Sequence, residues 1–337
     1  MYGDKAQQTR STAALWIGAL LLVGVVFAGQ ARTLYQQARD NVAYARLNKA
    51  LVQESEAQLD ETAKVLAGIG VTQPTAPSVW RGIALIHLTQ GRLAETADAY
   101  AHLNDPMVEV KAWGDRAERA KHWEMAQAWR QVAVLLEPEN GDHWYRLAHA
   151  SAEQDRPEAV DFYLKALAAP QRTDFGRSNI MTRLGEIEKR RDSVQWPMVL
   201  AHFQDAIDQD DFIDEGDLIV ARMGVAEALD RLGQYREALA AYEWVARYAP
   251  GNYWANVHSG RLSWLAEGDA GKAVDYLQKA IALDDSRKWP YLNLAHVYAQ
   301  SGNREEAITL LQKVLTLDPD DDNARTQLEN LLNSDES

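Results

Sequence analysis

A pattern of glycine, alanine and large apolar residues recurs at a nearly constant step in the C-terminal part of the chain. Gly233, Gly268 and Gly302 lie 35 and 34 residues apart. The same two steps separate two further sets, which are Ala238, Ala273 and Ala307, and Tyr242, Leu277 and Leu311. A repeat of this length is typical of solenoids, in which each unit packs mainly on its neighbours. We therefore expect an array of similar units.

Residues 288–321 show what one unit contains. Two apolar stripes at helical spacing are formed by Tyr291, Leu294, Ala295 and Tyr298, and by Ala307, Leu311 and Val314. Gly302 separates the two stripes, and Pro319 ends the second one because proline cannot continue a helix. Each unit is therefore predicted to be a pair of antiparallel helices joined by a tight turn.

This order of residues resembles the tetratricopeptide repeat, a helical hairpin of 34 residues. The resemblance implies an all-α solenoid, a right-handed superhelix of helical hairpins. Its segments are residues 77–106, 107–140, 141–170, 171–218, 219–252, 253–287 and 288–321. Residues 171–218 depart most from the pattern, and we interpret them as a degenerate repeat with longer loops. Residues 322–337 are expected to form a capping helix and an acidic tail, so that the helix covers the last repeat.

The N-terminal region contains an apolar segment of membrane-spanning length. Residues 11–31, which follow a short tail of residues 1–10, carry no charged side chain. As a helix they would be roughly 31 Å long, which matches the hydrocarbon core of a bilayer. A transmembrane helix is predicted, with a cleaved signal peptide as the alternative. Small residues that would permit close helix packing are Ala14, Gly18, Gly24 and Ala28.

Residues 32–76 are predicted to form a juxtamembrane helix and a linker, because residues 33–67 contain no glycine or proline. This helix could fold against the first repeats or take part in self-association. Basic residues are balanced on the two sides of residues 11–31, so the positive-inside rule does not decide the orientation. We expect a single-pass membrane protein whose repeats lie outside the cytoplasm.

Composition and motifs exclude several classes of function. The net charge of −14 argues against bulk binding of nucleic acid, since few cations remain to neutralise phosphates. The chain has no cysteine, and it contains no phosphate-binding glycine loop or metalloprotease motif. Asp318, Asp320, Asp322 and Glu329 resemble a calcium loop, but Asn323 replaces its turn glycine. The sequence predicts no enzyme activity, no cofactor and no metal site.

The resemblance also implies where a partner would bind. In tetratricopeptide arrays the first helix of each hairpin lines the concave groove. The matching positions are Arg81, Lys111, Tyr145, Arg146, His149, Trp254, His258, Arg261, Trp264, Trp289, Asn293 and His296. Trp254, His258 and Arg261 follow i, i+4, i+7 spacing and share one helix face. Aromatic and arginine side chains often anchor interfaces, although some of these residues could instead pack between repeats.

Two functions follow from these features. The first is a membrane-anchored scaffold or adaptor that binds a protein segment in its groove and supports assembly of a complex. The second is an accessory subunit of an integral-membrane enzyme or transport complex, in which the transmembrane helix is part of the interface.

Overall fold

The computed structural model describes residues 64 and 77–333 of the chain. These residues form fifteen helices. The described part contains no β-strand, and its one β-type contact is an isolated bridge between Asn140 and Gln171. The prediction of an all-α repeat structure is therefore confirmed for this part of the chain. None of the described helices has both the length and the apolar character needed to cross a bilayer. The predicted transmembrane helix and its small packing residues lie outside the described residues, as do residues 1–10, almost all of residues 32–76, and residues 334–337.

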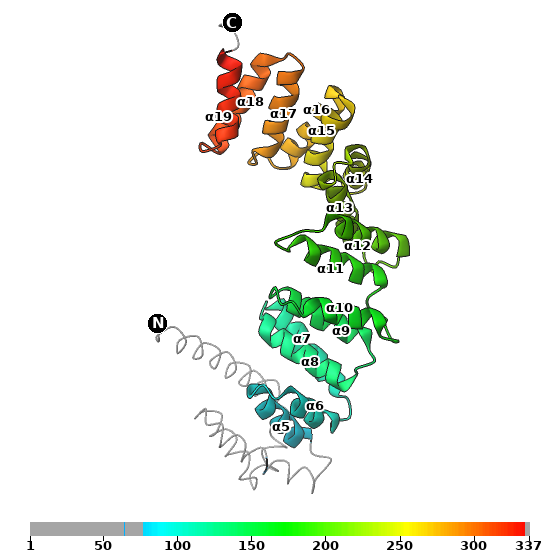
Figure 1. Ribbon diagram of the computed structural model, residues 1–337. Helices are drawn as coiled ribbons and strands as arrows, with labels where there is room; N and C mark the ends of the chain where they lie inside the picture. The colour runs from blue at the N-terminus through cyan, green and yellow to red at the C-terminus, as the bar shows by residue number, and fades with distance from the viewer. Residues whose placement is uncertain (1–63, 65–76, 334–337) are drawn as a thin grey trace. The chain divides into compact units, whose positions relative to one another are not determined.

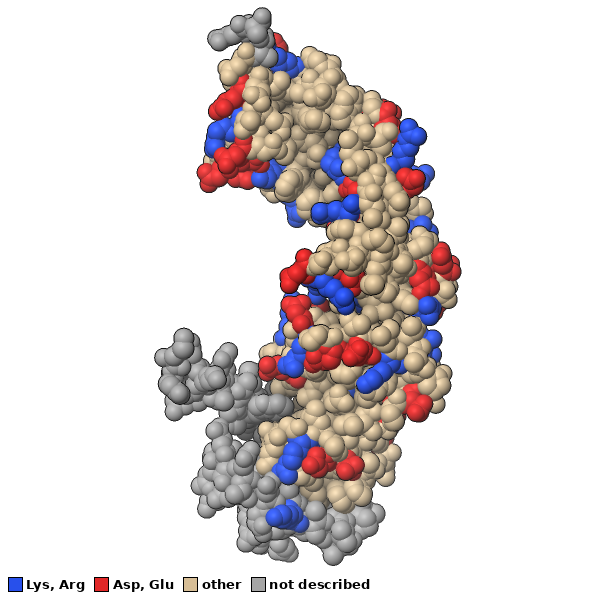
Figure 2. All heavy atoms as spheres, in the orientation of Figure 1, with Lys and Arg blue, Asp and Glu red and all other residues tan. Residues whose placement is uncertain are grey.

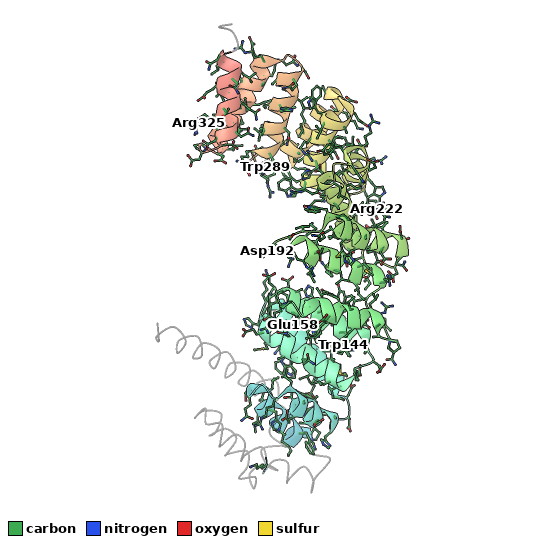
Figure 3. All side chains as sticks on the ribbon, in the orientation of Figure 1. Trp144, Glu158, Asp192, Arg222, Trp289 and Arg325 are labelled. Carbon is green, nitrogen blue, oxygen red and sulfur yellow. The ribbon has the colours of Figure 1, made fainter. Side chains whose placement is uncertain are left out.

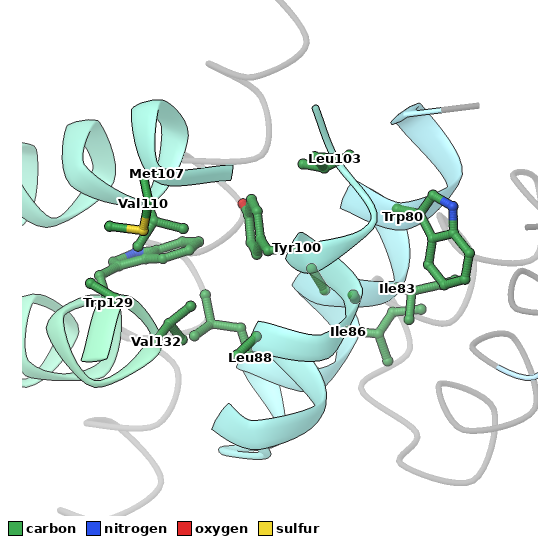
Figure 4. Packing of buried hydrophobic residues seen from close by; sticks show 14 of the residues in the cluster. Trp80, Ile83, Ile86, Leu88, Tyr100, Leu103, Met107, Val110, Trp129 and Val132 are labelled. Carbon is green, nitrogen blue, oxygen red and sulfur yellow. The ribbon is translucent and has the colours of Figure 1, made fainter. Parts of the chain in front are cut away.

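The described chain divides into two compact units, the first ending at Leu136 and the second beginning at Glu137. The helices of unit 1 are α5 (Pro77–Thr89), α6 (Leu93–Ala101), α7 (Pro106–Arg119) and α8 (Trp123–Leu136). Aromatic residues from three of these helices meet aliphatic side chains in a shared core (Figure 4). Tyr100 packs edge-on against Trp129, with ring centroids 5.8 Å apart.

Unit 2 continues the same hairpin pattern along the chain (Figure 1). Its helices are α9 (Gly141–Ala152), α10 (Ala159–Ala168), α11 (Arg177–Lys189), α12 (Trp196–Gln209), α13 (Glu215–Arg231), α14 (Tyr235–Tyr248), α15 (Tyr253–Glu267), α16 (Ala270–Leu283), α17 (Trp289–Gln300), α18 (Arg304–Leu317) and α19 (Asp322–Asn333). α13 begins four residues before the predicted repeat start at residue 219. The reason is that the Asp214 side chain caps it, accepting a hydrogen bond of 2.9 Å from the Asp217 backbone N–H.

The repeating glycines lie in the turns between paired helices. Gly233, Gly268 and Gly302 have φ values of 76°, 67° and 83°. This left-handed conformation costs a residue with a Cβ roughly 1–2 kcal/mol, so glycine is favoured there. Lys121 after α7 and Asp155 after α9 also have left-handed φ values, 56° and 52°, without being glycine. The glycine period therefore reports the spacing of the turns.

The segment interpreted as a degenerate repeat forms a hairpin of α11 and α12. The Phe203 ring of α12 is completely buried between Gly185 of α11 and Gly224 of α13. A Cβ atom built on Gly185 would lie 2.8 Å from this ring, and one on Gly224 would lie 2.4 Å from it. The ring therefore occupies space that alanines on the neighbouring helices would fill. Phe203 is the eighth residue of α12, the position that Tyr242, Leu277 and Leu311 hold in α14, α16 and α18, so this hairpin keeps the large residue of the repeat pattern.

Cations from the last hairpin hold both ends of α19. Lys288 donates hydrogen bonds of 2.6 Å to Asp318 and to Asp321, and the Asp321 carboxylate accepts from the Ala324 N–H in the first turn of α19. Arg304 donates to the carbonyls of Leu331 and Leu332 in the last turn. These carboxylates are part of the sequence that resembles a calcium loop. In the structure, Asp318 and Asp321 of this segment bind the Lys288 ammonium.

Candidate functional site

The twelve residues predicted to line a groove all lie on first helices of hairpins. Arg81 and Lys111 belong to α5 and α7 of unit 1. The others belong to α9, α15 and α17 of unit 2. We therefore describe the two groups separately. Within each group, the contacts of the side chain decide whether it is available to a partner.

The predicted arginines are already paired with carboxylates. Arg81 binds Glu109 of α7 through its Nε atom at 2.8 Å, and Arg261 forms an ion pair with Asp230 of α13. Arg146 lies 3.8 Å from the Asp174 carboxylate. An acidic group of a partner would therefore have to displace a carboxylate of the chain itself to reach these arginines.

Tyr145 belongs to the core of unit 2 and not to its surface. It is 5% exposed and stacks on Phe175, with ring centroids 3.9 Å apart. The loop that carries Phe175 is held by Asp142, whose carboxylate accepts backbone N–H bonds from Thr173, Asp174 and Phe175. Burial of Asp142 acts to raise its pKa, but these hydrogen bonds outweigh it and hold the pKa below its ordinary value. The predicted role of Tyr145 in a groove is therefore wrong.

His258 and Trp264 are also turned toward the protein. The His258 ring stacks on Tyr242 with centroids 4.8 Å apart, and its Nδ1 has no hydrogen-bond partner in the described structure. Burial and then the charge of Arg261 lower the pKa of His258 to about 4, so the imidazole is neutral near pH 7. Trp264 packs against the apolar cluster of α16 and α17. Neither residue offers the open surface that its repeat position predicts.

Trp254 and Trp289 remain exposed, at 39% and 46% of their surface. Trp254 is the second residue of α15 and Trp289 is the first residue of α17. Figure 3 shows Trp289 at the end of α17, on a side where Figure 2 shows unit 2 to be hollowed. Arg287, two residues before Trp289, has its guanidinium carbon 5.8 Å from the centre of the Trp254 ring, so the starts of α15 and α17 are in contact here. We refer to Tyr253, Trp254, Arg287, Lys288 and Trp289 as the tryptophan edge.

The other predicted residues have a smaller part in this surface. Asn293 donates a 2.9 Å hydrogen bond to the Trp289 carbonyl one turn earlier in α17. His296 in α17 and Lys111 in α7 are exposed. His149 lies 4.0 Å from Glu153, the residue that follows α9. Among the predicted residues, the two tryptophans are thus the ones that combine large exposed rings with neighbouring charged groups.

Ion pairs between successive first helices were not predicted from the sequence. Arg183 of α11 binds Asp217 of α13 at 3.0 Å, and Lys189 of α11 binds Glu227 of α13 at 2.7 Å. The Arg261–Asp230 pair links α13 to α15 in the same way. Identifying such partners requires the register between neighbouring repeats, which spacing along the sequence does not provide.

The described residues do not offer a centre for metal binding. No group of three or more histidine or acidic residues in residues 77–333 is arranged to hold a metal ion. The polar clusters described above consist of ion pairs and helix caps.

Comparisons with known proteins agree with the architecture. Two tetratricopeptide repeat models match the chain, one at residues 265–331 and the other at residues 226–288. The mitochondrial import receptor subunit TOM70 of Rattus norvegicus is 29% identical over 92 residues, which is 27% of this chain. The chain spans about 15% of the length of the curated relatives that it matches.

Two solved structures show the same fold. The structure of pilF from Pseudomonas aeruginosa has a TM-score of 0.54 and 14% identity, covering 71% of this chain and 99% of that one. YrrB, described as a TPR protein with an unusual peptide-binding site, has a TM-score of 0.52 and 17% identity, covering 59% of this chain and 97% of that one. The chain therefore contains tetratricopeptide repeats and folds as a tetratricopeptide solenoid in its described part.

Proposed function

We propose that this chain is a non-enzymatic tetratricopeptide scaffold that binds a protein segment at the tryptophan edge of unit 2. The observation that carries this proposal is the exposure of Trp254 and Trp289 at corresponding ends of two neighbouring first helices. Exposed tryptophans are common anchors of interfaces because a rigid indole buries a large apolar area at little entropic cost. The rat relative is named as a mitochondrial import receptor subunit, which supports a binding role for the repeats.

Photocrosslinking tests this proposal in the whole chain. A benzophenone amino acid replaces Trp254 or Trp289, and in a control it replaces Tyr235, an exposed aromatic residue that begins α14. We expect the same protein partner to be crosslinked from both tryptophan positions and not from Tyr235. Partners captured equally from all three positions, or from none of them, would contradict a binding site at the tryptophan edge.

We also propose that residues 11–31 anchor the scaffold in a membrane, with the repeats outside the cytoplasm. The support is their length and their lack of charged side chains. Resistance of the chain to alkaline extraction, an intact N-terminal mass and protease access to the repeats from the outer side are the expected results. A soluble protein that begins near Arg32 would instead show a cleaved signal peptide.

Purification in mild detergent separates the scaffold from the accessory-subunit alternative. A stoichiometric integral-membrane complex that is lost when residues 11–31 are exchanged for an unrelated membrane helix would favour the accessory subunit. Partners retained after that exchange would favour the scaffold.

A further inference from the structure

The spacing of the two exposed tryptophans matches an extended chain. α15 and α17 pack on each other, and packed helices lie roughly 8–10 Å apart. Trp254 and Trp289 lie in the first turns of these helices, so their backbones are separated by about one such step. An extended chain rises about 3.3 Å per residue, so side chains three residues apart span about 10 Å. A bound extended segment could therefore place one side chain on each tryptophan.

Both indole rings already have a cation over them. The Arg287 guanidinium carbon lies 4.8 Å from the Tyr253 ring centre and 5.8 Å from that of Trp254. The Lys288 Nζ lies 5.2 Å from the Trp289 ring centre. Each cation is tied by a carboxylate, Arg287 to Asp284 at 2.6 Å and Lys288 as described above. The rings are thus in an environment that accepts cations, and 39% and 46% of the two tryptophans stay open to solvent.

The loops beside these rings carry an excess of negative charge. Residues 284–288 and 318–322 contain six aspartates, one arginine and one lysine, and Arg325 pairs with Asp322 at 2.6 Å, which leaves a net charge of −3. In the described part of the chain, Asp285 and Asp320 are exposed and form no ion pair. Figure 2 shows carboxylates gathered at the end of unit 2 where α19 begins. Local charge therefore favours a positively charged partner.

We propose that the tryptophan edge binds a basic, extended protein segment with arginine or lysine at every third residue. Two such side chains lie on the exposed faces of Trp254 and Trp289, and the aspartates in the two loops balance their charge. This inference rests on the proposed binding function and adds the chemistry of the partner. An acidic segment would meet unpaired carboxylates, and Arg261 is not free to receive it because Asp230 already binds its guanidinium.

Labelled peptides test the chemistry with the full chain in mild detergent. One nonapeptide carries arginine at positions 2, 5 and 8 among glycine, serine and proline residues. Matched peptides carry glutamate or leucine at those positions, or arginines moved to adjacent positions. Binding is followed by fluorescence anisotropy. We expect the spaced arginine peptide to bind at least tenfold more tightly than the glutamate peptide, and to weaken as salt is raised from 50 to 500 mM.

Variants locate the binding. Trp254→Ala and Trp289→Ala should each weaken the arginine peptide at least fivefold, and the double change Asp285→Asn with Asp320→Asn should weaken it at least threefold. Tyr235→Ala, which removes another exposed aromatic ring, should leave binding unchanged. Thermal unfolding followed by circular dichroism shows whether each variant is folded. Because 39% and 46% of the two tryptophans are exposed and neither belongs to a core cluster of the described residues, we expect their loss to leave the helices intact.

The outcomes separate this inference from the proposed function. Binding of the glutamate or leucine peptide in preference to arginine, with loss in the tryptophan variants, would overturn the basic partner and support the binding surface. Arginine binding that is insensitive to both tryptophans would overturn the inference, as would the absence of arginine-peptide binding at millimolar concentration. Photocrosslinking from Trp254 and Trp289 then decides independently whether the surface binds a protein at all.

Discussion

Replacing Gly224 by alanine should destabilise unit 2, although alanine is the better helix former. In an exposed helix interior this change stabilises by about 1 kcal/mol. Here the new Cβ would lie 2.4 Å from two carbons of the Phe203 ring and 2.5 Å from a third. The ring is 0% exposed and is confined on its other side by Gly185. Overpacking of a buried site costs about 1–3 kcal/mol, so we expect a net loss of up to about 2 kcal/mol.

Hydrogen exchange measured by mass spectrometry is the suitable assay, because repeat arrays open locally and need not unfold in one step. We expect faster exchange in α11, α12 and α13 and little change in α17 and α18. Gly271→Ala is the matched control. Its Cβ would meet only the Asp269 Oδ1 atom at 3.5 Å, an ordinary contact, so exchange should stay the same or slow slightly.

A double variant tests the cause of the effect. Phe203→Leu leaves a void on its own, but with Gly224→Ala it makes room for the new methyl group. The two changes should therefore couple favourably, by about 0.5–3 kcal/mol. Slower exchange in the Gly224→Ala variant, or additive effects of the two changes, would refute the argument that the Phe203 ring requires glycine.

Three further predictions concern other described residues. The free energy of unfolding should fall by about 3 kcal/mol between pH 6.5 and 4, because His258 takes up its proton in this range in the unfolded chain and only near pH 4 in the folded chain. In the His258→Phe variant, the melting temperature should depend less on pH over this range. Lys121→Gly should stabilise unit 1 by up to about 1 kcal/mol, because Lys121 has a positive φ. Hydrogen exchange in α7 and α8 should slow, and faster exchange would contradict this. Arg130→Met should destabilise α7 and α8 by about 2–3 kcal/mol, because the 1% exposed guanidinium neutralises Asp115 and Glu118. Unchanged hydrogen exchange in these helices would show that the two ion pairs do not contribute to stability.

Local features of the fold could be predicted from the sequence. The turn glycines are visible because a left-handed φ favours glycine wherever the turn recurs. The apolar stripes are visible because the helix period places them on one face. The packing of residues 171–218 could not be predicted in the same way. Phe203 fits between two glycines that lie 18 residues before it and 21 residues after it, and only the register of three helices brings them together.

The candidate site was predicted less completely for a related reason. Repeat position places a side chain on a helix, but its neighbours decide whether it is free. Trp254 and Trp289 are exposed as expected, whereas Tyr145 is covered by Phe175 from a loop that no repeat pattern describes. Arg261 is paired with Asp230, 31 residues earlier in the chain. The expected exposure therefore holds for Trp254 and Trp289 and not for Tyr145.

The attachment of α19 also bears on whether copies of this chain could stack on each other. The end face of a solenoid resembles the interface between its own repeats, so an open end can stack on another copy head to tail and produce a filament. Lys288 and Arg304 hold the two ends of α19 across that face. Its outward residues are mostly polar, namely Asp322, Arg325, Glu329 and Asn330, with Leu332 as an apolar neighbour. This polar face disfavours head-to-tail stacking of copies on α19, which Lys288 holds by ion pairs and Arg304 by hydrogen bonds to backbone carbonyls.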